Sequence, residues 1–539
     1  MYSVLSQKSM GKKTDIKILG LLFLFVFILE FWVSVNSYTH DLYNRVDSAC
    51  FFLCGKAWMN GMIPYVDFSD SKGPLLWLIF GIGYLFSNYN YLGIFWIECI
   101  FYTVTFFYCY KIGFLFLKDT KTAFLCSVLM SLAFFCSAYH FETRAEDFCQ
   151  PFIMGGLYYT LRVLYGFPKD KDITVASFAI GVGFAAALLI KFTIAAMIMI
   201  FFFALLWYLI QCRRDKIVKS FLYAFLGFFL VVFPFVLYFL LKGNFSDFIK
   251  EYFVATSQSV VKKFSLIRMI KEYLLMGWGN LLHLSILKSI TICFLLVNIA
   301  GGCLFFYKKL PAFKLFPAII ALWFVCISMY HSMWLAYYYQ SFSGFAIFPI
   351  IMYLTFFKRF TLKKLQLAVV TGAIAVIVIA ENLLFSPRPN FFLNKTEERT
   401  DFYYVNLILS QVHNPKLMYS FIELGYGTPA HALPGYKYWF GWLGATDPMI
   451  LGREWAIKNH LPDFIIILPA YDTDNHFEHI VQQSGYVKFY TWMTQELTVH
   501  YETYLYGKPG FSIPSRPDFH ITPMDILLKK RIISVKAGN

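Results

Sequence analysis

Charged residues are scarce in this chain. Lys, Arg, Asp and Glu make up 15% of the 539 residues, and 58% of the residues are hydrophobic. Soluble domains carry roughly 25% charged residues, so this deficit excludes an ordinary soluble fold. Aromatic residues are abundant instead, with 62 Phe and 37 Tyr. The composition therefore indicates an integral membrane protein.

A concentrated basic surface is also missing. The formal net charge is +15, but Lys and Arg occur as short clusters between apolar runs rather than as one patch. Because nucleic-acid binding needs a gathered basic footprint, this distribution argues against it. Short basic clusters between apolar segments are what topology selection and lipid headgroups require.

Several catalytic signatures are absent from the sequence. The histidines show no metal-ligand spacing, and there is neither a P-loop nor a nucleophile elbow. All 11 cysteines lie at or before Cys326. Cys50 and Cys54 are four residues apart, which on a helix separates their Cβ atoms by about 5–6 Å. A disulfide needs about 3.8 Å, so cysteine says little about the redox compartment.

No small-residue cleavage pattern follows the first apolar run, so we expect this run to be retained as an anchor. About 20 apolar residues cross the hydrocarbon of a bilayer, and on that basis about 11 spans are predicted. They are 18–36, 89–110, 121–139, 147–166, 174–190, 192–211, 220–241, 286–306, 315–333, 340–357 and 367–386. The basic clusters then fall on one side, which is expected to be the cytoplasm.

The polar segments that remain lie on the outer side. They include the loop 37–73 and the segment 242–285, which is predicted to form one or two helices on the membrane surface. The apolar stretch 74–87 is too short to cross comfortably and is predicted to be a re-entrant or interfacial helix. Beyond residue 386, strand-like runs alternate with turns and helical stretches. Residues 387–539 are therefore predicted to form an outer α/β domain appended to a transmembrane domain, 1–386.

The loop 37–73 concentrates the candidate chemistry. Asp47 lies near the start of a helix-like run, where negative charge is favoured. At the membrane edge it can act as a general base toward a hydroxyl, although a solvated loop acid is the alternative. Asp67, Asp70 and Lys72 come just before Pro74. Lys72 therefore lies just before the start of an apolar helix. There it can bind a lipid phosphate or serve as a snorkelling anchor.

Two other stretches place polar groups at span ends. Glu142, Arg144 and Glu146 lie between two predicted spans, and ionisable groups at such depth usually face a polar cavity. A plain charged turn is the alternative there. Three consecutive tyrosines, 337–339, stand before another span. They are predicted either to form an interfacial aromatic belt or to close a phosphate or sugar site.

Together these residues resemble the GT-C class of polyprenyl-phosphate-sugar glycosyltransferases, especially the bacterial relatives of protein O-mannosyltransferases and of the lipid A aminoarabinose transferase. The pattern that carries the resemblance is Asp47-x-x-x-Phe51-x-x-x-Gly55-Lys56, then Gly61-x-x-Pro64-Tyr65-x-Asp67-x-x-Asp70-x-Lys72-Gly73-Pro74-Leu75. Two later stretches resemble further motifs of the class, namely Arg144-Ala-Glu146-Asp147-Phe and Tyr337-Tyr338-Tyr339. The resemblance covers about residues 1–360.

The resemblance implies a multi-span α-helical, GT-C-like membrane fold and a transfer with inversion. A monosaccharide would move from a polyprenyl-phosphate donor to the hydroxyl of a lipid, glycan or protein acceptor. Asp47 would be the base and Lys72 would neutralise the donor phosphate. The other implied substrate-binding residues are Arg45, Asp67, Asp70, Arg144, Glu146, Tyr337, Tyr338 and Arg268.

The implied location is the bacterial cytoplasmic membrane, with the N-terminus in the cytoplasm and the last domain outside. No metal ligand is assigned. A divalent metal is left open, but Ser71 stands where aminoarabinose transferases have an acidic residue before the lysine, which argues against a metal site built on that position. Two other functions remain as alternatives: a flippase or transporter of lipid-linked sugars, and a polysaccharide polymerase or ligase.

Overall fold

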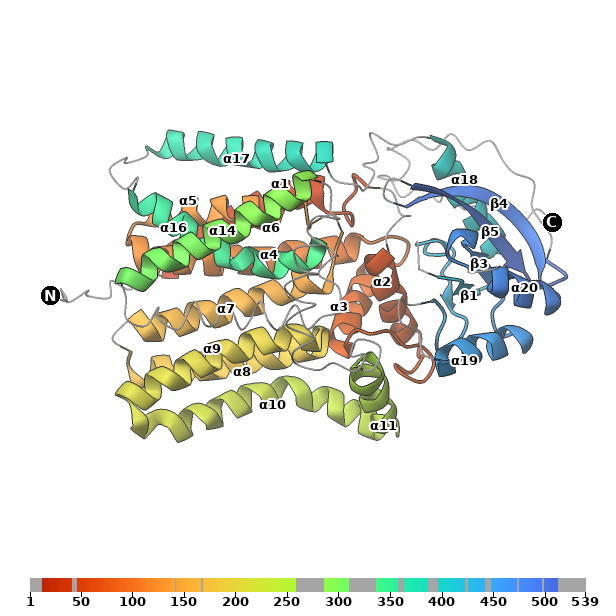
Figure 1. Ribbon diagram of the computed structural model, residues 1–539, viewed down its shortest axis with the longest axis horizontal. Coiled ribbons are helices and arrows are strands. Elements are labelled where there is room, and N and C mark those ends of the chain that lie inside the picture. Colours follow the sequence, from red (N-terminus) through yellow and green to blue (C-terminus); the bar gives the residue numbers. More distant parts are fainter. Residues whose placement is uncertain are drawn as a thin grey trace.

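The computed structural model combines a long helical bundle with a small sheet domain at one end of it (Figure 1). The structure describes residues 12–40, 46–140, 142–165, 168–257, 286–309, 336–356, 363–385, 396–421, 425–441, 447–472, 475–496 and 499–511. In Figure 1 the bundle helices run side by side along the long axis of the molecule.

Among the described residues, six helices are long and apolar enough to cross a membrane. They are α1 (Lys12–Val33), α4 (Leu92–Leu117), α8 (Asp170–Ile190), α9 (Phe192–Cys212), α10 (Ile217–Leu241) and α17 (Lys364–Phe385). The bundle also contains α5 (Thr120–Leu129), α6 (Ser131–Phe134), α7 (Ala145–Tyr165), α14 (Ile286–Lys309), the 3₁₀ helix η4 (Ala336–Ala346) and α16 (Ile347–Phe356). The chain is a multi-pass membrane protein. The predicted span 315–333 lies outside the described residues, and each other predicted span contains a helix.

Glycines allow neighbouring helices to approach closely. A Cβ atom added to Gly181 of α8 would lie 2.0 Å from the Ala224 carbonyl oxygen of α10, and one added to Gly227 would lie 2.3 Å from the Phe178 oxygen. Such small residues at helix contacts are typical of membrane bundles. In lipid there is no hydrophobic driving force for helix association, so the helices associate through close backbone packing.

Three short helical elements lie where the bundle meets the sheet domain. They are α2 (Val46–Met59), α3 (Pro74–Phe86) and α11 (Phe245–Phe248), which continues into the π-helical turn η2 (Ile249–Ala255). The stretch predicted to be a short helix at 74–87 is thus a 13-residue helix. A Cβ on Gly55 of α2 would come within 2.4 Å of the Gly81 nitrogen of α3, so this glycine of the motif lets the two helices touch.

The sheet domain has five strands in the order β2-β1-β3-β5-β4. The strands are β1 (Lys416–Tyr419), β2 (Leu433–Pro434), β3 (Phe464–Ile467), β4 (Val487–Glu496) and β5 (Val499–Gly507). Strands β2, β1 and β3 are parallel, whereas β5 runs antiparallel to β3 and β4. The helices are α18 (Thr396–Leu409), α19 (Asp447–Lys458) and α20 (His476–Gln483). The sequence did not predict β2 or α19.

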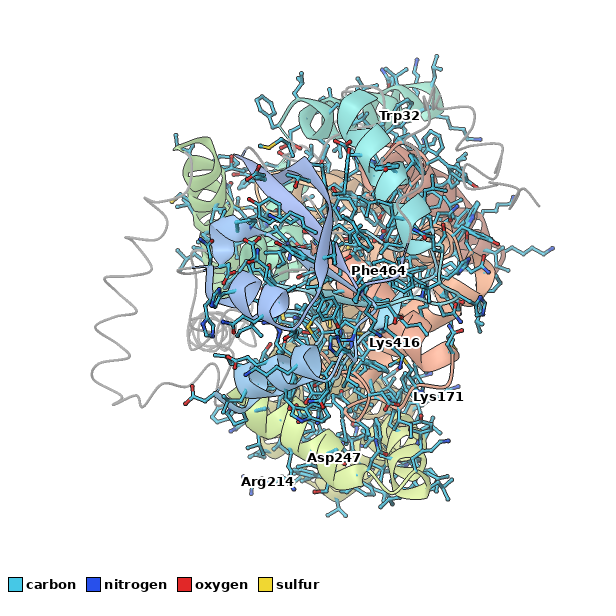
Figure 2. The ribbon with its side chains drawn as sticks, turned by 90° about the vertical axis from the view of Figure 1, so that its right-hand side faces the viewer. Trp32, Lys171, Arg214, Asp247, Lys416 and Phe464 are labelled. Atoms are coloured by element: carbon cyan, nitrogen blue, oxygen red, sulfur yellow. The ribbon has the colours of Figure 1, made fainter. Side chains whose placement is uncertain are left out.

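The sheet domain lies across one end of the bundle. Seen from that end, Lys416 and Phe464 of the sheet lie in front of the helices, and Asp247 of α11 lies below them (Figure 2). The opposite end holds ion pairs between basic and acidic residues at the predicted cytoplasmic side. These pairs are Lys111–Asp15, Arg162–Asp172 and Arg213–Asp170.

Candidate active site

Asp47 occupies the first turn of α2, at the sheet-domain end of the bundle. Its backbone N–H donates to Glu142 Oε1 at 2.8 Å, and its carboxylate pairs with the Arg144 guanidinium. Arg144 also donates to Glu142 Oε2 at 2.8 Å. The helix N-terminus and the guanidinium both favour a negative charge at this position. The Asp47 side chain remains 24% exposed, so a substrate can still reach it.

The electrostatics around Asp47 keep it ionised. Burial by itself raises the pKa of this carboxyl, but the charges of Arg144, Lys72 and Lys191 outweigh burial and lower the pKa below its ordinary value. Arg144 acts on Asp47 through direct contact, and Lys72 and Lys191 act through their charges. An ionised carboxylate is the form that can accept a proton from a hydroxyl.

Lys72 projects from the loop between α2 and α3. Its ammonium donates to Ser71 Oγ at 3.0 Å and lies 5.5 Å from the centre of the Phe51 ring. Asp70 is 5% exposed and accepts from the Ser71 backbone N–H at 2.6 Å. Burial raises the pKa of the Asp70 carboxyl, and Lys72 partly opposes this shift. Asp70 and Lys72 thus both contact Ser71, and the charge of Lys72 also lowers the pKa of Asp47.

The loop is fixed to the bundle just after Lys72. Gly73 N–H donates to the Ile190 carbonyl at 3.0 Å, at the point where α8 ends. The Tyr65 hydroxyl donates to the Lys72 carbonyl at 3.2 Å. A Cβ on Gly73 would lie 2.0 Å from the Leu189 oxygen and 2.7 Å from the Tyr252 hydroxyl. Only glycine fits there, which gives the Lys-Gly-Pro sequence a packing reason.

Lys191 separates α8 from α9 and has an extended backbone. Its ammonium pairs with the Glu146 carboxylate, and both side chains are at least nine-tenths buried. The sequence predicted Glu146 to bind substrate, and in the structure its carboxylate pairs with Lys191. A buried ion pair of this kind is costly to break, because the remaining charge is left uncompensated.

A second polar cluster lies behind Arg144. Asp147 accepts hydrogen bonds from the Arg144 backbone N–H, at 2.7 Å, and from Tyr102 and Gln340. His140 Nδ1 lies 3.5 Å from Asp147 Oδ1. These contacts fix the start of α7 and thereby the direction of Arg144. Gln340, which comes directly after the three tyrosines, was not predicted from the sequence.

A third set of contacts holds Ser48, next to Asp47, through side chains that follow α1 or belong to α4. Ser48 Oγ donates to Asn36 Oδ1 at 2.9 Å, and Asn36 Nδ2 donates to Thr143 Oγ1 at 2.7 Å. Glu98 in turn accepts from Thr143 at 2.5 Å and from Ser34 at 2.7 Å. These side chains are buried. They tie the first turn of α2 to the residues just before α7.

The remaining residues predicted to bind substrate differ in how the structure places them. Asp67 accepts from the Ile63 backbone N–H at 2.6 Å, which closes a turn. Tyr337 and Tyr338 lie in η4, although the structure describes only their backbone. Arg45 and Arg268 lie outside the described residues. Within the described part of the chain, no group of three or more His, Cys, Asp and Glu side chains is arranged to hold a metal ion.

Arg144→Gln should shift the pH dependence of activity. Without the guanidinium, burial has more influence on the pKa of Asp47, so this pKa rises. A carboxylate base is active above its pKa, so the acidic limb of the kcat/KM profile should move to higher pH. A pH–rate profile of the purified variant measures this. Arg162→Gln, at the other end of α7, removes a matched Arg–Asp pair and should leave the acidic limb unchanged. An unmoved limb in Arg144→Gln would contradict the electrostatic role.

Comparison with known proteins supports the fold. Residues 72–239 match the family described as Dolichyl-phosphate-mannose-protein mannosyltransferase. No curated protein sequence matches the chain. The structure is similar to ArnT from Cupriavidus metallidurans bound to undecaprenyl phosphate, with a TM-score of 0.53, 12% identity, and coverage of 94% of this chain and 100% of that chain.

The apo state of the same ArnT gives a TM-score of 0.54 at 10% identity, covering 91% of this chain and 97% of that chain. At such identity the likeness concerns the fold, which extends over the bundle and the sheet domain together. The expected multi-span helical fold and the resemblance to GT-C transferases are confirmed. The chain has the fold of a GT-C membrane glycosyltransferase, and residues 72–239 carry the sequence pattern of the mannosyltransferase family.

Proposed function

We propose that this protein transfers a monosaccharide from a polyprenyl-phosphate donor to an acceptor hydroxyl, with inversion, at the sheet-domain end of the bundle. The family match to residues 72–239 begins at Lys72, and the structurally similar ArnT was crystallised with undecaprenyl phosphate. The acceptor is a lipid, a glycan or a protein. The proposed location is the bacterial cytoplasmic membrane, with the sheet domain outside.

One observation carries the proposal. A partly exposed carboxylate, Asp47, pairs with the Arg144 guanidinium at the end of an apolar bundle, and the charges of Lys72 and Lys191 also lower its pKa. A lipid-linked phosphosugar has an apolar tail for the bundle, an anionic phosphate for the cations and a sugar for the solvent side. The charge that develops on the leaving phosphate is best stabilised by fixed cations in a poorly hydrated site.

The reaction is a single displacement. Asp47 removes the proton of the acceptor hydroxyl as its oxygen forms a bond to the anomeric carbon of the sugar. The bond between that carbon and the phosphate oxygen breaks, and its electron pair leaves with the polyprenyl phosphate. Lys72 stabilises this anion, with Arg144 beside it. Since the acceptor enters opposite to the leaving group, the configuration at the anomeric carbon inverts.

The position of the ionisable groups disfavours a transporter of lipid-linked sugars. Transporters hold their substrate and ion sites near the bilayer midplane, at the interface of repeated halves. Here the described acids and bases that surround Asp47 lie at one end of the bundle, beside the sheet domain.

The direct test is transfer by the purified full-length protein. We expect it to move sugar from an undecaprenyl-phosphate-linked monosaccharide to an acceptor extract, with release of undecaprenyl phosphate. Mass spectrometry identifies the product, and NMR coupling constants give its anomeric configuration. A product with the donor's configuration would contradict the single displacement, and passage of intact donor across vesicles without any transfer would favour the transporter.

A further inference from the structure

The sheet domain contacts the loop that carries Lys72 through one largely covered carboxylate. Glu251, on the π-helical turn η2, accepts from Lys437 Nζ at 2.7 Å and from the Tyr438 hydroxyl at 2.9 Å. It also accepts from Ser69 Oγ at 3.3 Å. The Glu251 side chain is 12% exposed. One carboxylate thus joins three segments that are distant in the sequence.

The contact extends to the backbone. Ser69 N–H donates to the Lys437 carbonyl at 2.9 Å, so this residue of the sheet domain contacts the loop directly. Ser69 stands three residues before Lys72. The loop is therefore held on one side by the sheet domain at Ser69 and on the other by the end of α8 at Gly73. Lys72 lies between these two attachments.

The turn η2 connects both attachments. Tyr252, next to Glu251, donates its hydroxyl to the Leu188 carbonyl at 2.7 Å and accepts from Phe192 N–H at 3.0 Å. Glu251 and Tyr252 thus link the sheet domain to the break between α8 and α9. Single π-helical turns are rare and often occur at functional sites, where they redirect particular side chains.

We propose that Glu251 is a positioning residue, which ties the sheet domain to the loop 69–73 and so sets the place of the Lys72 ammonium for the donor phosphate. This rests on the proposed phosphate-binding role of Lys72. A lysine side chain is long and flexible, and it loses rotamer freedom when its ammonium binds a phosphate. The affinity for the phosphate therefore depends on where the loop places Lys72. A sheet domain held at Ser69 therefore strengthens donor binding without touching the donor.

Binding of undecaprenyl phosphate to the full-length protein in detergent tests this role. Glu251→Ala should raise the Kd by about tenfold, because a charge-assisted hydrogen-bond cluster at the loop is lost. Glu251→Gln retains an acceptor oxygen but loses the ion pair, so its Kd should rise less. Exchange of the two charges, in Glu251→Lys with Lys437→Glu, should restore most of the affinity that either single substitution loses.

A matched control lies inside the sheet domain. Lys508 and Asp463 form an ion pair of similar length, 2.8 Å, and similar exposure, which joins the residue before β3 to the residue after β5. Asp463→Asn should lower Tm about as much as Glu251→Ala and leave the Kd unchanged. An unchanged Kd in Glu251→Ala, or an equal rise in Asp463→Asn, would overturn the positioning role.

The two proposals can fail separately. If Asp47→Asn transfers sugar as well as the wild type does, the proposed function fails, whatever the result at Glu251. If Asp47→Asn is inactive and Lys72→Ala binds undecaprenyl phosphate weakly, the function stands. A wild-type Kd in Glu251→Ala would then overturn only the positioning role.

Discussion

Asp47→Asn is expected to reduce transfer by about a thousandfold while the protein still inserts and folds. A positioned general base contributes about 10²–10⁴ to the rate, and asparagine cannot accept the proton. The substitution keeps the shape of the side chain, and its amide oxygen can still accept from Arg144. The backbone N–H that donates to Glu142 is unchanged. The loss should therefore fall on kcat, measured with purified lipid-linked donor.

Asp172→Asn provides the matched control. Asp172 pairs with Arg162 at 2.5 Å at the opposite end of the bundle, so the substitution removes the same charge from the same kind of ion pair. Its transfer rate should stay near that of the wild type. Unimpaired transfer by Asp47→Asn would remove the basis of the proposed mechanism, and an equal loss in both variants would indicate general destabilisation instead.

Gly73→Ala should weaken the binding of undecaprenyl phosphate by about tenfold or more and also lower Tm. The new methyl group would stand 2.0 Å from a backbone oxygen of Leu189, which cannot move without unwinding the end of α8. Overpacking of this kind costs about 1–3 kcal/mol, and about 1.4 kcal/mol corresponds to tenfold in binding. The loop would have to leave α8, and Lys72 would move with it.

Two further variants distinguish a displacement of Lys72 from the loss of its charge. Lys72→Ala should weaken binding to a similar degree but leave Tm nearly unchanged, because Lys72 is only partly buried. Gly372→Ala, in α17, is the control for the added methyl group, since no atom lies within 4 Å of its added Cβ. It should affect neither quantity. Normal binding by Gly73→Ala would show that the contact at Leu189 does not position Lys72.

The candidate site was only partly predictable. Asp47 and Lys72 stood out in the sequence because polar residues beside apolar spans are rare and costly. Their neighbours in the sequence also carried the resemblance to the GT-C class. Asp67 had the same kind of signal, and in the structure it closes a turn at Ile63. Local sequence thus indicates where polar groups gather, but it does not separate a turn-forming acid from one that faces a site.

Partners that are distant in the chain could not be predicted. Arg144 and Asp47 are 97 residues apart, and Lys191 and Glu146 are 45 residues apart. Glu251 lies in the segment 242–285, for which the sequence predicted only helices on the membrane surface. Its contacts with Ser69 and Lys437 arise only when η2, the loop and the sheet domain meet.

The sequence alone determined that this is a multi-span membrane protein with a polar loop after its first span, because hydrophobic length and charge spacing act locally along the chain. It also determined the class of enzyme that the loop resembles. Only the tertiary structure decided which cation meets Asp47 and that the sheet domain holds the loop of Lys72. Such pairings depend on how helices and domains pack, since a buried charge is stabilised by whichever partner the fold brings within a few ångströms.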